Sequence, residues 1–289
     1  MADFKKIVSD NVDGDFFVDT TCINCDTCRQ LAPNTFEDNG DYSYVFNQPE
    51  SEEENLRATE ALLACPTGSI GNRGQSLVRE VIERFPLPIE DNVYYCGFNS
   101  PKSYGGNSFY VQEPDGGWLI DAPKFNNNLV SKLEEMGGIK YIFLTHEDDV
   151  ADSDKFAAHF KAQRIIHKKA LSAQPDSEIV IEGNADKKFL ENFTIITTPG
   201  HTEGHMVLLY KNKYLFSGDH LYWSRRTQKL DAHERHCWYS FEEMTKSMEK
   251  LIDYEFEWVL AGHGDRGKLS KDQIKSQLKA LVSKMRSYS

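Results

Sequence analysis

The pattern of hydrophobic and polar positions changes near residue 90 of this chain. Beyond that point, short runs rich in Val, Ile, Leu, Phe and Tyr are separated by Gly and Asn, which predicts β-strands joined by turns. The predicted strands are NVYYCGF, NSFYVQE, GGWLIDA, KYIFLTH, RIIH, FTIITTPG, MVLLYKN, KYLFSGD and EWVLAGH. Apolar residues at helical spacing predict helices at NNNLVSKLEEMG, DKFAAHFKA and SFEEMTKSMEKLI and over Lys271–Met285. The pattern therefore predicts a β-rich domain with several helices over residues 90–289.

The residues before this domain carry one clear helical pattern. The stretch PESEEENLRATEALLAC begins with carboxylates and turns apolar at helical spacing, which predicts a helix with acidic residues at its positive end. A short predicted helix from Ser76 to Arg84 then runs into Pro86 and Pro88, which favour extended chain. We expect a first domain over residues 1–72, a linker over about 73–89 and a second domain over 90–289.

Composition narrows the classes of function. The chain has 289 residues, of which 39% are hydrophobic, enough for two domains with cores of their own. Acidic residues outnumber basic ones by 45 to 33, and the net charge of -12 argues against binding to nucleic acid or an anionic membrane. The start MADFKKIVSD lacks the apolar core of a signal peptide, and no run of about 18 apolar residues occurs, so we expect a cytoplasmic protein.

Four of the six cysteines lie in the first domain. CINCDTC places Cys22, Cys25 and Cys28 at CxxCxxC spacing, and Cys65 is followed by Pro66. Three thiolates from one loop and a distant fourth suit an iron–sulfur cube, although four thiolates would also suit zinc. Because zinc sites favour paired CxxC knuckles, we favour iron. FVDTTCINCDTC and ACPTGSI, within residues 1–72, resemble single-cluster ferredoxins of the 4Fe-4S type, and the resemblance implies that the four cysteines bind one 4Fe-4S cluster.

A second group of polar residues lies in LTHEDDVADSDKF. Carboxylates this close repel one another unless a cation or hydrogen-bond donors compensate them. The segment is either a metal site or a solvated acidic loop before a helix, since Asp and Ser are favoured at helix N-termini. Other histidine and aspartate motifs also follow predicted strands, where catalytic side chains are common. They are LID with Asp121, TPGHTEGH with His201, SGDH with Asp219 and AGHG with His263.

In this order, the motifs resemble those of the metallo-β-lactamase fold superfamily over residues 90–270. The resemblance implies an α+β protein in which the ferredoxin-like domain precedes an αββα sandwich. It also implies one or two metal ions. The superfamily's HxHxDH motif is altered here: a rigid alignment puts Val150 and Ala151 at its Asp-His positions, and a two-residue insertion moves the pair to Asp152 and Ser153.

The resemblance then implies two metal sites. The first consists of His146, Asp148 and His201; the second takes Asp152 and His263, with Asp219 bridging. Asp148 and Asp152 are the candidate catalytic carboxylates, with Asp149 as a rival for Asp148 and helix capping as an alternative role for Asp152. Carboxylate-rich sets shift the preference from zinc towards iron or manganese.

The remaining polar residues have less specific roles. His205 is expected to support the site, and Asp121 to orient it through hydrogen bonds. Arg225 and Arg226 follow Asp219 and would bind either an anionic substrate or only a surface carboxylate; their position near the metal motifs favours the substrate. Cys96 and Cys237 are expected to be small buried residues.

Three functions fit these features. The first is a metal-dependent hydrolase of a small-molecule ester, thioester or lactone, the reaction of most relatives with this fold. The second is an iron-dependent oxidoreductase similar to flavodiiron proteins, which also replace the second histidine of the motif by a carboxylate. Its ferredoxin domain would supply electrons from a redox partner protein. The third is a non-catalytic redox-sensing or interaction module. Superfamily frequency favours the hydrolase.

Overall fold

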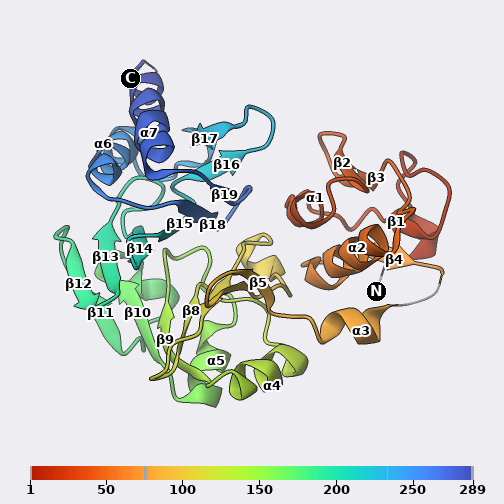
Figure 1. Ribbon diagram of the computed structural model, residues 1–289, viewed down its shortest axis with the longest axis horizontal. Coiled ribbons are helices and arrows are strands. Elements are labelled where there is room, and N and C mark those ends of the chain that lie inside the picture. Colours follow the sequence, from red (N-terminus) through yellow and green to blue (C-terminus); the bar gives the residue numbers. More distant parts are fainter. Residues whose placement is uncertain (1, 75–76, 233, 288–289) are drawn as a thin grey trace. The chain divides into compact units, whose positions relative to one another are not determined.

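The computed structural model describes residues 2–74, 77–232 and 234–287. The chain divides into two compact units, Met1–Lys140 with Ala151–Lys161 and Tyr141–Val150 with Ala162–Ser289. Figure 1 labels their helices and strands. Among the described residues, no helix has the length and apolar character needed to cross a bilayer.

The first unit begins with two small antiparallel sheets and two helices. Strand β1 (Phe16–Val18) pairs with β4 (Ile70–Asn72), and β2 (Phe36–Asp38) pairs with β3 (Ser43–Val45). Short helix α1 (Thr27–Leu31) and helix α2 (Glu52–Ala64) complete this part. Helix α2 begins where the sequence predicts it, because Ser51 and Glu54 form a capping box and three glutamates fill the first turn.

The rest of the first unit contains an antiparallel run of strands and three helices. Neighbouring strands pair in the order β5 (Leu87–Glu90), β6 (Val93–Tyr95), β7 (Phe109–Val111) and β8 (Gly117–Ile120). The helices are α3 (Val78–Ile82), α4 (Asn127–Glu135) and α5 (Ser153–Phe160). Helix α3 lies inside the predicted Ser76–Arg84 helix, whose start at Ser76 is outside the described residues.

The second unit contains a short parallel run and a six-stranded sheet. Strand β9 (Ile139–Phe143) enters it from the first unit and pairs in parallel with β10 (Gln163–His167), which pairs with β11 (Ile179–Ile181). The six-stranded sheet has the order β12 (Lys187–Leu190), β13 (Phe193–Thr197), β14 (Met206–Tyr210), β15 (Tyr214–Gly218), β18 (Trp258–Ala261) and β19 (Gly267–Lys268). A hairpin of β16 (Tyr222–Ser224) and β17 (Lys229–Asp231) lies outside it.

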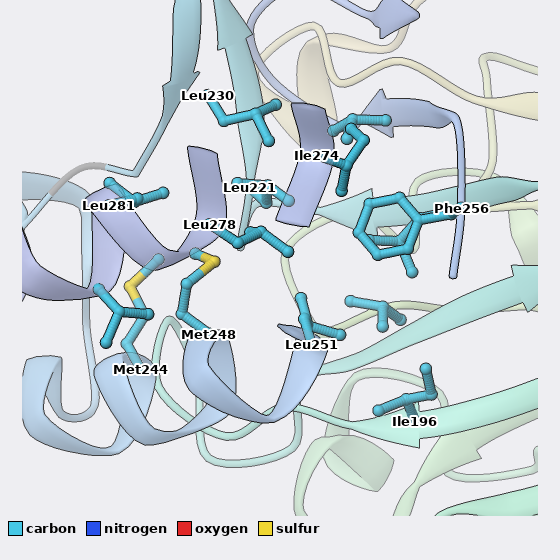
Figure 2. Packing of buried hydrophobic residues seen from close by; sticks show 14 of the residues in the cluster. Ile196, Leu221, Leu230, Met244, Met248, Leu251, Phe256, Ile274, Leu278 and Leu281 are labelled. Atoms are coloured by element: carbon cyan, nitrogen blue, oxygen red, sulfur yellow. The ribbon is translucent and has the colours of Figure 1, made fainter. Parts of the chain in front are cut away.

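Helices α6 (Phe241–Lys250) and α7 (Lys271–Arg286) cover a hydrophobic core in this unit. Figure 2 shows Met244 and Met248 of α6 facing Leu278 and Leu281 of α7. Helix α7 matches its predicted range to within one residue, since a capping box of Ser270 and Gln273 starts it. This packing fixes the sheet whose strands end at the candidate site.

Short 3-10 turns join several of these elements. They are Phe4–Lys6, Pro101–Ser103, Lys168–Ala173, Glu234–His236 and Leu251–Asp253.

Candidate metal centres

The four cysteines of the CxxCxxC and Cys-Pro motifs line one pocket in the first unit. Cys22 and Cys25 lie in the loop before α1, Cys28 lies in α1, and Cys65 ends α2. Residues far apart in sequence are therefore brought together as the spacing predicts.

Backbone N–H groups point at the sulfur atoms of this pocket. Asn24 and Ser43 each donate to Cys22 Sγ at 3.4 Å, and Ser69 donates to Cys65 Sγ at 3.3 Å. Such bonds stabilise thiolates bound to iron. Burial raises the pKa of Cys25 to about 11 and raises that of Cys28 further, so a positive metal centre is needed to hold these sulfurs ionised. The donor set and its surroundings fit a 4Fe-4S cluster.

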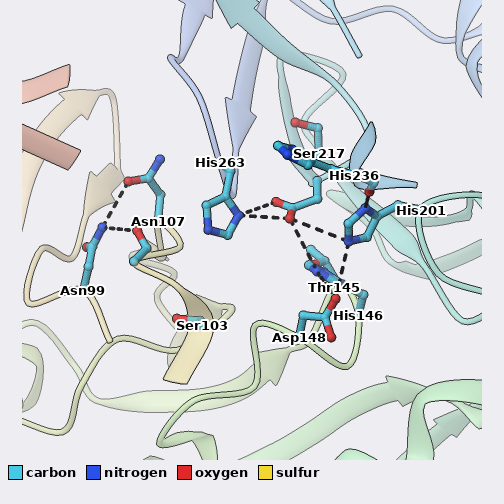
Figure 3. A network of polar contacts seen from close by, with 12 residues as sticks. Asn99, Ser103, Asn107, Thr145, His146, Asp148, His201, Ser217, His236 and His263 are labelled. Carbon is cyan, nitrogen blue, oxygen red and sulfur yellow. Dashed lines mark hydrogen bonds and ion pairs between the residues drawn. The ribbon is translucent and has the colours of Figure 1, made fainter. Parts of the chain in front are cut away.

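The histidine motifs come together in the second unit, at the ends of its strands. His146 follows β9, His201 follows β13, Asp219 directly follows β15 and His263 follows β18. Figure 3 shows the side chains of His146, His201 and His263 converging. The arrangement brings together five of the six residues that the sequence predicts as metal ligands, namely His146, His201, Asp219, His263 and Asp148.

Two histidine nitrogens define the centre of this site. His146 Nε2 lies 3.9 Å from Asp148 Oδ2 and 3.8 Å from Asp219 Oδ2. His201 Nε2 lies 3.6 Å and 3.7 Å from the same two atoms. Both Nε2 atoms are buried and have no hydrogen-bond partner among the described residues. Buried polar atoms of this kind are rare, and a cation between them and the carboxylates would satisfy all four groups.

The other ring nitrogens are held by hydrogen bonds. His201 Nδ1 donates to the backbone oxygen of His236, which leaves its Nε2 lone pair facing the site. His146 Nδ1 shares a hydrogen bond of 2.9 Å with Thr145 Oγ1. Burial lowers the pKa of His146 to about 4, so this ring is neutral and able to bind a metal near neutral pH. The histidines are thus oriented in the way that metal ligands usually are.

A second group of potential ligand atoms adjoins the first. The ligand atoms of His146, Asp149 and Asp219 lie within 4.8 Å of one another. A Cβ atom on Gly262 would lie 2.8 Å from Asp219 Oδ1 and 2.9 Å from Asp149 Oδ2, so only glycine leaves room for both carboxylates. His263 Nδ1 lies 2.8 Å from Asp219 Oδ1. Together the two groups provide nitrogen and oxygen ligands for one or two metal ions.

Asp152 belongs to a different set of contacts, in the first unit. Its Oδ1 accepts from Lys102 at 2.7 Å and lies 3.2 Å from Lys155 Nζ, and its Oδ2 accepts from the backbone of Phe125 at 3.0 Å. It precedes helix α5 without capping it through its side chain. The structure therefore brings Asp149, rather than Asp152, together with His146 and Asp219.

The supporting residues have defined positions. His205 is buried; its Nδ1 shares a hydrogen bond of 2.9 Å with Thr198 Oγ1, and its Nε2 accepts one of 3.3 Å from the backbone N–H of Asp219. His205 therefore supports the backbone at Asp219. Arg225 pairs with Asp265 at 2.7 Å, whereas Arg226 is exposed. Cys96 is fully buried, and Cys237 donates to the backbone of Gly200 at 3.0 Å. Asp121 is buried in the first unit with φ 52.

Sequence reasoning did not single out two exposed aromatic residues beside His201. The backbone N–H groups of Trp238 and Tyr239 donate to the His201 oxygen at 2.8 and 3.1 Å. The Trp238 ring lies 6.2 Å from the His201 ring and is 65% exposed, and Tyr239 is 50% exposed. The hydrogen bonds to His201 hold this exposed aromatic pair beside the candidate site. Those contacts are not visible in the sequence.

Comparisons with known proteins agree with both parts of this structure. Residues 18–72 match the family of 4Fe-4S single cluster domains of ferredoxin I. The crystal structure of DIM-1 metallo-β-lactamase matches with a TM-score of 0.54 at 17% identity, over 70% of this chain and 96% of that chain. A metallo-β-lactamase from Pontibacter korlensis matches with a TM-score of 0.52 at 14% identity, over 69% and 97%. The chain thus joins a ferredoxin-type 4Fe-4S domain to a metallo-β-lactamase fold, and the predicted α+β fold class is confirmed.

Among curated proteins, this chain is similar to hydroxyacylglutathione hydrolases. The hydroxyacylglutathione hydrolases of Salmonella paratyphi C (strain RKS4594) and Salmonella newport (strain SL254) are 34% identical over 128 residues, which is 43% of this chain and 51% of theirs. The chain spans about half the length of the curated relatives that it matches.

Proposed function

We propose that this chain is a metal-dependent hydrolase of small-molecule esters or thioesters, with a 4Fe-4S cluster in its N-terminal part. The observation that carries the proposal is the pair of buried Nε2 atoms of His146 and His201, which converge on carboxylates without a hydrogen bond. The fold and the similarity to hydroxyacylglutathione hydrolases support the same class of reaction.

His146, His201, Asp148, Asp149, Asp219 and His263 would hold the metal. A divalent ion there supplies Lewis acidity, which polarises a carbonyl group and lets water ionise near neutral pH. His236 and Thr145 keep the two central imidazoles in place, and His205 braces Asp219. These contacts preorganise the ligands before substrate arrives.

Asp148 is the candidate general base. Its Oδ2 faces the two histidines, and its side chain is 49% exposed, so Oδ1 is left to accept a proton from the attacking water. The His201 ring beside it keeps the pKa of Asp148 below its ordinary value, so the carboxylate is ionised near neutral pH. Attack on the carbonyl then breaks the bond to sulfur or oxygen, and the leaving group takes up the proton.

The exposed rings of Trp238 and Tyr239 are the candidate surface for the substrate. They are anchored to the backbone of His201, so a substrate lying over them has its scissile bond near the proposed metal ligands. Aromatic surfaces of this kind bind apolar or flat groups.

Hydrolysis of S-lactoylglutathione, measured by loss of the thioester absorbance under anaerobic conditions, tests the proposal. We expect turnover that disappears when the site metal is chelated and returns with zinc, iron or manganese, and that needs no reductant. A His146→Ala variant should lose it, whereas a His159→Ala variant, in an exposed histidine outside the site, should keep it. If this thioester is not hydrolysed, simple aryl esters are assayed next. Turnover that does not need the metal would contradict the proposal.

The carboxylate-rich site favours a second candidate. The two adjoining groups of ligand atoms contain three aspartates and two histidines, a harder donor set than three histidines and one that suits iron. An iron-dependent oxidoreductase supplied with electrons through the cluster would turn over only with a reductant, and the same assay separates the two functions.

A further inference from the structure

The loop over residues 98–107 contacts the cysteine pocket, although it lies outside the segment that matches the ferredoxin family. Gly105 has φ +87, and a Cβ atom there would lie 2.7 Å from Cys25 Cβ and 2.9 Å from Cys25 Sγ. The same atom would lie 3.2 Å from Pro66, which follows the fourth cysteine. Only glycine fits at this contact, so the loop packs closely against Cys25 and Pro66, two residues that line the cysteine pocket.

Asn99 fastens the loop to the pocket. Its buried amide donates to Gly105 O at 2.7 Å and to Thr27 Oγ1 at 3.1 Å, and Thr27 lies 3.3 Å from Cys25 Sγ. Its backbone N–H donates at 3.2 Å to Ala64 O, next to Cys65. In Figure 3 the Asn99 amide also reaches Asn107, which donates in turn to Gln30. The loop is therefore tied to both cysteine-bearing segments.

The same loop holds Asp152. Lys102, in the Pro101–Ser103 turn, donates to Asp152 Oδ1 at 2.7 Å, and the Asp152 side chain is only 6% exposed. Asp152 follows Asp149, a proposed metal ligand, after two residues, and Ala151 between them has φ 36, a conformation that alanine rarely adopts. A short piece of chain with one left-handed residue therefore joins Asp152 to Asp149.

We propose that the 98–107 loop couples the cluster to the metal-ligand loop, with Gly105 and Asn99 at the cluster end and Lys102 at the Asp152 end. Reduction adds one electron to the cluster, and the low-potential one-electron donor that supplies it is oxidised by one electron. The added negative charge lies against Gly105 and Thr27, and tight packing transmits the adjustment along the loop. The inference rests on the proposed metal site but not on hydrolysis.

Thermodynamic linkage provides the test. If reduction changes the affinity for metal by some factor, then metal must change the equilibrium constant for reduction of the cluster by the same factor, which shifts its reduction potential. The midpoint potential of the anaerobic full-length protein is measured by spectroelectrochemistry with the histidine site zinc-free and zinc-loaded. For a tenfold change in affinity we expect a shift of about 59 mV between the two forms.

Variants locate the path of the coupling. In Lys102→Met the zinc-dependent shift should fall by more than half, while cluster content and zinc binding persist. Lys155→Met is the matched control, since Lys155 also pairs with Asp152 but lies outside the loop. Gly105→Ala should change the cluster potential itself, whereas Gly137→Ala, with φ +110 and nothing within 4 Å, should not.

The outcomes separate this inference from the proposed function. A potential that does not respond to zinc, or a shift that Lys102→Met leaves unchanged, overturns the coupling, even if the protein hydrolyses thioesters. A shift that persists in Lys102→Met would mean that the charge of the zinc ion acts on the cluster through space and not through the loop. A zinc-dependent shift that Lys102→Met removes supports the coupling, even if no ester is hydrolysed. Failure to bind zinc, iron or manganese at the histidine site overturns both proposals. If the Gly105→Ala variant loses the cluster, the zinc-dependent shift in Lys102→Met alone tests the coupling, because the hydrogen bond of Lys102 is to Asp152 and not to a cysteine.

Discussion

At the scale of single residues, the aspartates of the 146–152 segment divide into two groups. Asp148 and Asp149 lie with His146, whereas Asp152 is held by Lys102 and Phe125. The sequence shows that carboxylates follow the β9 strand, but spacing alone does not determine which of them faces the histidines. The left-handed turn at Ala151 redirects the chain, and this turn has no signature in the sequence.

We therefore expect Asp149→Asn to weaken zinc binding by more than about 100-fold, because a charged ligand is lost, and Asp152→Asn to weaken it by less than about tenfold. Competition with a chromophoric chelator measures both affinities. Asp154→Asn, in an exposed carboxylate of helix α5, is the control and should bind zinc like the parent. Equal losses in Asp149→Asn and Asp152→Asn would contradict this assignment.

Trp238 is the residue that should affect substrate binding without affecting the metal. Truncating its exposed ring in Trp238→Ala should raise KM roughly three- to tenfold and leave kcat and zinc content unchanged, because the ring offers the substrate a contact surface but no metal ligand. Leu190→Ala, at an exposed apolar residue of the same unit, is the control. Steady-state kinetics measure both variants; an unchanged KM in Trp238→Ala would contradict the substrate surface.

At the scale of elements, helices were more predictable than strands. Helix α7 was predicted at Lys271–Met285 because an apolar stripe repeats over four turns between clear caps, and it occupies Lys271–Arg286. The three-residue strands β1 to β4 and the β16–β17 hairpin were not predicted. Strands this short carry too little alternation to be distinguished from loops, and their pairing depends on distant partners.

Helix α7 also supports the sheet beneath the candidate site. Leu278 is fully buried between α7 and α6, so Leu278→Ala should lower the free energy of unfolding by about 2–5 kcal/mol. Lys279→Ala, on the exposed face of the same helix, should change it by less than about 0.5 kcal/mol. Denaturant titration followed by circular dichroism measures both; equal stability of the two variants would show that this core is not needed.

At the scale of the whole molecule, one chain carries two candidate metal sites with different donor atoms, sulfur in one and nitrogen and oxygen in the other. Their donor types were predictable, because cysteine and histidine motifs carry recognisable spacing. The contact of Gly105 with Cys25 and the pairing of Lys102 with Asp152 were not, since they join residues far apart in sequence. Long-range contacts of this kind leave no local pattern.

The cysteine site should depend on its four cysteines alone. Cys25→Ser should abolish or strongly reduce the four-iron signal in electron paramagnetic resonance after reduction, while zinc binding at the histidine site persists. Cys237→Ser is the control, because this cysteine lies outside the pocket and serine can still donate to Gly200. Loss of the cluster in Cys237→Ser, or its retention in Cys25→Ser, would show that the cluster ligands are assigned wrongly.

The central claim, that the histidine and aspartate residues form a metal centre separate from the cluster, is tested most directly by anomalous diffraction. Crystals of the anaerobic protein, loaded with zinc, are measured at the iron and zinc absorption edges. We predict an iron peak among Cys22, Cys25, Cys28 and Cys65, and a zinc peak about 2.0–2.1 Å from the Nε2 atoms of His146 and His201. Zinc among the cysteines, or no zinc peak beside those two nitrogens, would contradict the account.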